Sequence, residues 1–397
     1  MTDRELLERH KPILKFDPQY DYRALSASSA LANPGNQLLR SHGEVVARSS
    51  ESTPLALDSL TGYETEDGDF LAMSADYPGD AGRMEWEEDH RGRIYGQAVR
   101  NGGRTWLQYW FWLYYNPKHL FGFGKHEGDW EMIQIGLGED LTPEVASYAQ
   151  HNSGEARPWK EGAMDFAEAD PNRPLVYVAP FSHASYFKPG SQPYVLGVDD
   201  PRADGPPADL ALADFGDWAS WPGKWGNPER SIAGKVGRGP SSPAHQGSKW
   251  SDPDAWHRSL RYRKFRVLLG RAAHRLGFLT YPHEPASLSA RVEGNRVTVE
   301  WELAPRRSGR HLYVTLHQDH LVIGTRRIRA AGRSGETSLR VPDGRTATSV
   351  TVSVYNRMRQ RSVPKSEALA AQAPARANAD EVAAGQRPAA SHSRRGP

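Results

Sequence analysis

Short runs of alternating apolar and polar residues, separated by clusters of Gly, Pro and Asn, recur along this 397-residue chain and constrain its fold most strongly. Side chains of a β-strand point alternately to the two faces of a sheet, so a period of two predicts half-buried strands. Few runs have the period and length of a helix. We therefore expect a mainly β protein, with a β-sandwich-like N-terminal domain that has long loops and a smaller C-terminal sandwich.

The N-terminal region, residues 1–250, is dense in Gly, Pro, Trp and Tyr. Its apolar runs predict strands over residues 105–115, 130–137, 145–150 and 175–180. The connector, residues 251–285, begins with Asp252 as an N-cap and Pro253 at the first helical position, and is rich in arginine. We expect it to form a basic helix.

The C-terminal region, residues 286–363, alternates through Val297, Val299 and Trp301 and again through the valines of 350–354. This pattern resembles a fibronectin type III or immunoglobulin-like sandwich. Residues 364–397 hold almost no large apolar side chain, so they cannot offset the entropy of ordering, and we expect a disordered tail.

Charge is divided unevenly along the chain. Residues 1–254 carry 24 Lys and Arg against 38 Asp and Glu, whereas residues 255–365 carry 22 against 7. Either the basic section docks on the acidic body, or residues 255–275 contact an anionic surface, with nucleic acid the less favoured partner. No transmembrane segment and no secretory signal are predicted, so the default compartment is the cytoplasm. Peripheral membrane attachment and export without a cleavable signal stay open.

The chemistry-bearing residues gather after an aromatic strand. Asp129 and Glu131 at positions i and i+2 of a strand would project from one face, and His126 lies in the glycine-rich loop before them. Two carboxylates and an imidazole on one face suit a hard divalent cation. Because the chain has no cysteine, thiolate ligands are excluded. The alternative interpretation is that these residues are solvated strand and loop side chains.

Further ligands are predicted from the histidines near other strand ends. His183 follows the apolar strand 175–180, and His151 follows the strand 145–150. The expected ion is Ca²⁺, Mg²⁺ or Mn²⁺, with Zn²⁺ left open. Trp112, Tyr114 and Tyr115 of the aromatic strand are expected to flank the bound ligand.

These motifs together resemble two families. The Trp-rich strand, Gly-Lys-His-Glu-Gly-Asp-Trp-Glu and Phe-Ser-His-Ala-Ser-Tyr-Phe are similar to the vacuolar protein sorting-associated protein 62-like family over residues 10–250. His-Glu-Gly-Asp-Trp-Glu also resembles the heptapeptide of the necrosis- and ethylene-inducing-like toxins, whose β-sandwich binds a divalent cation and recognises sphingolipid head groups. The heptapeptide's first His, its Asp and its Glu fall on His126, Asp129 and Glu131. Its Arg and second His are replaced by Glu127 and Gly128. The toxins have a further acidic ligand a few residues upstream in a Pro-Lys-Asp context, and the resemblance implies His119 as an additional ligand at the corresponding place, one residue shifted.

The resemblance implies a non-enzymatic module in which a cation bridges to a polar or anionic head group of a lipid or glycan. Two alternatives remain open. A metal ion with an open coordination position would also serve a hydrolase of phosphoester, glycosidic or ester bonds. The polar cluster could equally tie loops together in a structural or trafficking adaptor.

Overall fold

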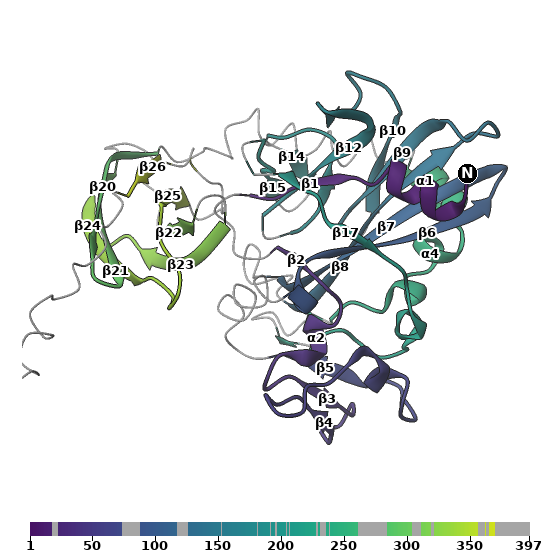
Figure 1. Cartoon of the computed structure of the whole chain (residues 1–397), viewed down its shortest axis with the longest axis horizontal. Coiled ribbons are helices and arrows are strands. Elements are labelled where there is room, and N and C mark those ends of the chain that lie inside the picture. Colours follow the sequence, from purple (N-terminus) through teal and green to yellow (C-terminus); the bar gives the residue numbers. More distant parts are fainter. Residues whose placement is uncertain are drawn as a thin grey trace, which may run out of the picture.

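The structure is a computed structural model with side chains. It describes residues 1–17, 23–73, 88–116, 126–151, 153–180, 182–190, 192–194, 197–203, 205, 207–227, 229–230, 236–237, 239–260, 284–303, 311–318, 321–355, 362 and 365–369. These residues form a mainly β protein, as the sequence predicted (Figure 1). In the described part of the chain, every helix is too short or too polar to cross a bilayer.

The main sheet of the N-terminal region has the strand order β10-β9-β8-β7-β6-β17, with β2 also paired to β7. Neighbouring strands are antiparallel except for β17, which runs parallel to β6. The predicted strands over 105–115, 130–137 and 145–150 are confirmed. The bounds are β2 (Ala24–Leu25), β6 (Arg93–Asn101), β7 (Arg104–Asn116), β8 (His126–Leu137), β9 (Pro143–Gln150), β10 (Ser153–Pro158) and β17 (Ala211–Ala213).

A second sheet, with the order β11-β12-β1-β16 and β13 beside β12, packs on one face of the main sheet. Leu14 of β1 and Val176 of β12 share a buried cluster with Phe111 of β7 and Ile133 of β8, so the two sheets form a sandwich. The predicted strand over 175–180 falls partly in β12. The bounds are β1 (Ile13–Lys15), β11 (Phe166–Ala167), β12 (Asp170–Val178), β13 (Ser185–Tyr186) and β16 (Pro207–Ala208).

The other face of the main sheet is covered by a tryptophan-rich core. Trp112 of β7 and Trp130 of β8 meet at 5.2 Å between ring centroids, and Trp225 packs on both. Tilted and edge-on contacts of this kind add to the stabilisation that burial provides. Seven tryptophans are therefore buried core residues of this cluster: Trp110, Trp112, Trp130, Trp218, Trp221, Trp225 and Trp256.

Short elements carry the chain over this tryptophan core. They include a small antiparallel sheet with the order β4-β3-β5, which lies at the bottom of Figure 1. Two isolated strand pairs, β14-β15 and β18-β19, complete the region, and Asp199 of β15 contacts Tyr186 of the second sheet. The bounds are α2 (Ser29–Ala32), β3 (Gln37–Leu39), β4 (Val45–Arg48), β5 (Phe70–Ala72), β14 (Gln192–Tyr194), β15 (Gly197–Asp199), β18 (Glu229–Arg230) and β19 (Val236–Gly237), with 3-10 turns at Leu57–Leu60, Glu88–His90, Asp217–Ser220 and Pro243–His245.

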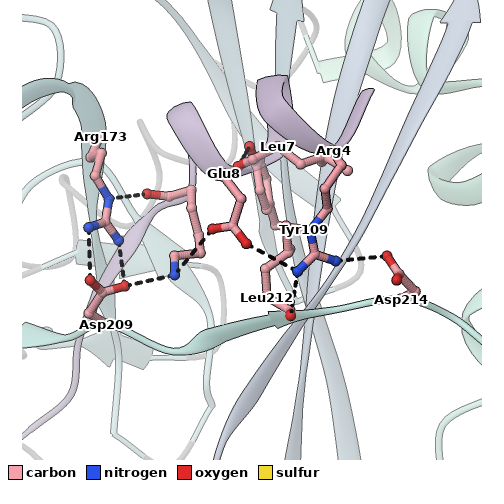
Figure 2. A network of polar contacts seen from close by, with 9 residues as sticks. Arg4, Leu7, Glu8, Tyr109, Arg173, Asp209, Leu212 and Asp214 are labelled. Carbon is pink, nitrogen blue, oxygen red and sulfur yellow. Dashed lines mark hydrogen bonds and ion pairs between the residues drawn. The ribbon is translucent and has the colours of Figure 1, made fainter. Parts of the chain in front are cut away.

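The N-terminal helix α1 (Asp3–Arg9) is fixed to the sandwich by its buried side and by a polar network (Figure 2). Tyr109 of β7 donates its hydroxyl proton to the carbonyl oxygen of Leu7 at 2.9 Å. Arg4 donates hydrogen bonds to the carboxylate of Asp214 and to the carbonyl oxygen of Leu212 in β17. Exposed ion pairs contribute little to stability. The attachment of α1 therefore depends mainly on the buried hydrogen bond of Tyr109 and on the burial of Leu7.

The C-terminal region is a second sandwich, with sheets of order β20-β21-β24 and β23-β22-β25-β26. Its core joins Val299 and Trp301 of one sheet to Val314 and Val352 of the other. The predicted boundary at 363 is wrong, because Lys365–Ala368 pair with β25 where a disordered tail was expected. The bounds are β20 (Pro285–Glu293), β21 (Arg296–Leu303), β22 (His311–Gln318), β23 (Leu321–Arg329), β24 (Ser334–Arg340), β25 (Ser349–Tyr355) and β26 (Lys365–Ala368).

The connector begins as predicted. Helix α5 (Pro253–Ser259) follows the short α4 (Ser248–Ser251), and the Asp252 side chain accepts a hydrogen bond from the backbone N–H of Ala255 at 3.0 Å. This is an N-cap with proline at the first helical position. Most of the predicted basic helix, over 261–283, and the tail from residue 370 lie outside the described residues.

Candidate functional site

Strand β8 presents two carboxylates on the side of the main sheet that faces the second sheet. Leu113 and Phe111 of β7 stand opposite Asp129 and Glu131, while Trp130 between them joins the tryptophan core on the other side. The predicted projection of Asp129 and Glu131 from one face therefore follows from strand alternation. Both are largely buried, at 9% and 6% exposure, so they are not the solvated strand residues of the alternative interpretation.

Asp129 is hydrogen-bonded from two directions. His183, in the turn after β12, places Nδ1 3.0 Å from Asp129 Oδ2, and Asn116 at the end of β7 donates Nδ2–H to the same oxygen at 3.2 Å. Burial works to raise the pKa of Asp129, but the hydrogen bond from His183 and the nearby charges of His126 and His183 outweigh it and lower that pKa. Asp129 is therefore held as a carboxylate.

Glu131 is in the opposite condition. Burial, together with the negative charge of Asp129, raises the pKa of Glu131 well above its usual value, and Asp199 adds to this rise. Its Oε2 atom is buried and has no hydrogen-bond partner among the described residues. A buried carboxyl group with an unpartnered oxygen is costly, and a cation placed against it would remove that cost.

His126 begins β8 but turns back onto its own backbone. Its Nδ1 lies 2.6 Å from the carbonyl oxygen of Gly128, whose φ of +65° bends the strand at that point. Its charge contributes to the lowered pKa of Asp129, so the two side chains lie within electrostatic range of each other. The predicted role of the glycine, which is to fold His126 back toward the acids, is consistent with this turn.

His151 belongs to a second imidazole–carboxylate pair. Its Nε2 lies 2.9 Å from Oδ2 of the buried Asp199, which also accepts a hydrogen bond from the Tyr186 hydroxyl at 2.6 Å. Both His151 and His183 have positive φ, near +53° and +55°, a conformation that costs a non-glycine residue free energy. Sequence reasoning missed Asp199, Asn116 and Tyr186, because their partners lie far away along the chain.

The predicted metal ligands that the structure describes are placed in different contacts. Across the described residues, no group of three or more His, Asp or Glu side chains is placed so that it could hold a metal ion. Asp129 pairs with His183, and Glu131 lies beside Asp129, but His126 is engaged with Gly128. His119 lies outside the described residues. Metal dependence therefore stays a prediction.

The predicted aromatic flank lies on the wrong face. Trp112 and Tyr114 are fully buried in the tryptophan core, and Tyr114 bonds through its hydroxyl to Asn36. Tyr115 is 5% exposed and belongs to the same core. The error arises because β7 is buried on both faces, so its continuous aromatic run does not show which residues face the carboxylates.

Comparison with known proteins gives distant likenesses only. No protein-family model matches the chain, and no curated protein matches it. Among solved structures, "NLPPya in complex with mannosamine" matches at 12% identity and a TM-score of 0.28, over 54% of this chain and 74% of that one. "Necrosis and Ethylene inducing Protein 2 from the causal agent of cocoa's Witches Broom disease" matches at 14% and 0.27, over 53% and 72%. The "non-toxic HaNLP3 protein" matches at 14% and 0.29, over 54% and 76%.

These structures belong to the toxin group that the heptapeptide resembles, but identities and TM-scores this low do not assign a function. The resemblance to the vacuolar protein sorting-associated protein 62-like family finds no support in these comparisons. What the fold defines is a mainly β, sandwich-like protein.

Proposed function

We propose that the N-terminal sandwich is a non-enzymatic binding module in which Asp129 and Glu131 hold a divalent cation that contacts a polar or anionic head group of a lipid or glycan. The observation that carries the proposal is the unpartnered buried oxygen of Glu131 beside the ionised Asp129. A cation there would neutralise two adjacent carboxylates and satisfy the orphaned oxygen.

The small number of protein ligands favours a bridging role. Mg²⁺ commonly binds through one or two carboxylates and completes its shell with water and ligand oxygens, whereas structural Zn²⁺ takes four protein ligands. Two carboxylates without a third protein ligand among the described residues suit the first case. His183, which hydrogen-bonds to Asp129, would then orient the carboxylate rather than bind the ion itself.

A direct titration of the metal alone tests the site. Protein stripped with a chelator is titrated calorimetrically with Ca²⁺, Mg²⁺, Mn²⁺ and Zn²⁺, beside the double variant Asp129→Asn and Glu131→Gln. The control is Asp67→Asn with Glu139→Gln, two exposed acids that give the same change in charge. We expect binding to be lost only in the site variant. Absence of binding by the native protein, or equal binding by the site variant, would remove the proposal.

Proton release gives a second readout of the same site. Burial and the charge of Asp129 raise the pKa of Glu131, so a cation that binds Glu131 displaces a proton at any pH at which this carboxyl group is protonated. The observed heat should therefore depend on the ionisation enthalpy of the buffer, and the dependence should disappear in Glu131→Gln. Vesicles with and without a glycosylated sphingolipid, in the presence and absence of the cation, then test the head group implied by the heptapeptide.

A metal-dependent hydrolase is the second candidate, favoured by one observation. The pKa of Asp129 is lowered and that of Glu131 is raised, and neighbouring carboxyl groups with divergent pKa values are typical of acid–base catalysis. A panel of chromogenic esters, phosphates and glycosides separates the two functions. Metal-dependent turnover that is lost in Glu131→Gln would replace the binding proposal with the enzyme.

A further inference from the structure

Ser185 faces the interior of the N-terminal sandwich from the second sheet. In strand β13 it stands opposite Val178 of β12, whose side chain belongs to the core between the two sheets. Residues paired across antiparallel strands share a face of the sheet, so Ser185 points toward the main sheet. Phe187, two residues further along the chain, lies in the same core and stacks on Tyr148 of β9 at 3.7 Å between ring centroids.

The same segment of chain meets the carboxyl groups of β8. His183, two residues before Ser185, is hydrogen-bonded to Asp129, and β13 packs against both β8 and β9. The side-chain amide of Gln150, at the end of β9, donates to the carbonyl oxygen of Ser185 at 3.1 Å. Glu131 faces the second sheet, as Asp129 does. Ser185 and Glu131 therefore point into the space between the two sheets from opposite sides.

Electrostatics also places Glu131 near this segment. The charge of Asp199 raises the pKa of Glu131, and Asp199 accepts a hydrogen bond from the hydroxyl of Tyr186, the residue next to Ser185. Ser185 is 0% exposed, and neither its Oγ atom nor Oε2 of Glu131 has a hydrogen-bond partner among the described residues. A buried hydroxyl group without a partner costs free energy that alanine would not cost. Packing alone therefore gives no reason for a serine at this position.

We propose that Ser185 is a positioning residue of the cation site, where its hydroxyl group hydrogen-bonds to a water molecule carried by the cation that Asp129 and Glu131 hold. This inference rests on the proposed cation site and adds a residue to its two carboxyl groups. Mg²⁺ keeps several water molecules when it binds through one or two carboxylates, and groups outside the ligand set orient that shell. Water on a cation directs its protons outward, and a hydroxyl oxygen can accept one of them.

The proposal predicts different effects on stability and on affinity. In the absence of a cation, Ser185→Ala removes a buried hydroxyl group that has no partner, so the thermal midpoint should not fall. The affinity for the cation should fall about 10–100-fold, which is the usual loss when a group that orients a metal site is removed. A serine that serves packing alone would do the reverse, because its loss would lower the midpoint and leave the affinity unchanged.

Calorimetric titration of the full chain with Mg²⁺ and with Ca²⁺, after treatment with a chelator, tests the proposal. The native protein is compared with Ser185→Ala and with Ser353→Ala. Ser353 is a matched control, because it is also 0% exposed with an unpartnered Oγ atom but lies in β25 of the C-terminal sandwich. The thermal midpoint of each protein is measured in the presence of the chelator.

The outcomes separate this inference from the proposed function. A loss of affinity of tenfold or more in Ser185→Ala alone, at an unchanged or higher midpoint, supports the role of Ser185. A smaller change overturns that role and leaves the site of two carboxyl groups in place, whereas absence of binding by the native chain overturns both. The role of Ser185 is also overturned if its variant has a lower midpoint in chelator, or if Ser353→Ala loses affinity equally.

Discussion

Replacement of Gly128 by alanine should destabilise the N-terminal sandwich through two effects that the structure separates. Gly128 has a φ of +65°, and a Cβ atom there would lie 2.1 Å from a ring carbon of Trp112 and 2.3 Å from the carbonyl oxygen of Trp225. The left-handed backbone costs alanine about 1 kcal/mol. Overpacking against the ring and the backbone adds about 1–3 kcal/mol. We expect a total loss of about 2–4 kcal/mol.

The chain provides a matched control for the backbone effect. Gly103 has a φ of +76°, but nothing lies within 4 Å of the position that its Cβ would take. Gly103→Ala should therefore cost about 1 kcal/mol, the backbone part alone. For a unit of this size each kcal/mol lowers the thermal midpoint by about 2–4 °C, so the two variants should be clearly separated.

Urea unfolding followed by tryptophan fluorescence is the appropriate assay, because Trp112 and Trp225 report on the core that the new methyl group would disturb. The free energies of unfolding are compared at a common slope, and circular dichroism checks that both variants fold. An equal loss in Gly128→Ala and Gly103→Ala would refute the packing argument, because it would show that Trp112 moves aside at no cost.

Two further predictions concern single buried groups. Burial lowers the pKa of His317 to about 4 from 6.5, so the unfolded chain binds its proton first. The stabilisation from neutral His317 is therefore fully present above pH 6.5, and the free energy of unfolding of the C-terminal sandwich falls by about 3 kcal/mol as the pH drops to 4. In His317→Gln the urea midpoint should not change across this pH range. Tyr109→Phe removes the hydrogen bond to the Leu7 carbonyl oxygen and should lower the free energy of unfolding by about 1 kcal/mol. Thermal unfolding measures the loss, and an unchanged midpoint would show that this bond does not anchor α1.

The strands around the candidate site were predictable because their local signals are strong. Strand β7 is long and rich in aromatic residues, and β8 alternates Trp130 and Met132 with polar residues after a glycine-rich segment, so both strands could be predicted from the sequence. The face of Asp129 and Glu131 followed from the period of two, with Trp130 between them as the marker. These predictions use residues that are neighbours along the chain.

The rest of the site was set by contacts between distant segments. Asp129 and His183 are 54 residues apart, and His151 meets Asp199 across 48 residues. No local period places these pairs together, because they depend on how β12 and the turn after it pack on β8 and β9. His183 was predicted to lie near Asp129, and the structure places the two in a hydrogen bond. Its role as a metal ligand stays a prediction.

Two of the residues that replace those of the toxin heptapeptide, Glu127 and Gly128, have a packing role here. Glu127 Oε2 accepts hydrogen bonds from the backbone N–H groups of Met73 and Asn227, at 2.9 and 2.8 Å, and so joins two distant segments to β8. At Gly128, the space that a side chain would need is filled by Trp112 and by the backbone of Trp225. Both contacts lie on the tryptophan-core side of the sheet.

The two replaced residues and the two matching carboxyl groups therefore lie on opposite faces of β8, while the matching Trp130 belongs to the tryptophan core. Asp129 and Glu131, which match the heptapeptide, point to the opposite side, where Asp129 meets His183. Two buried carboxyl groups on this face are costly, since an apolar pair would stabilise it more. The unpartnered oxygen of Glu131 is the physical argument for the proposal that a cation binds on this face.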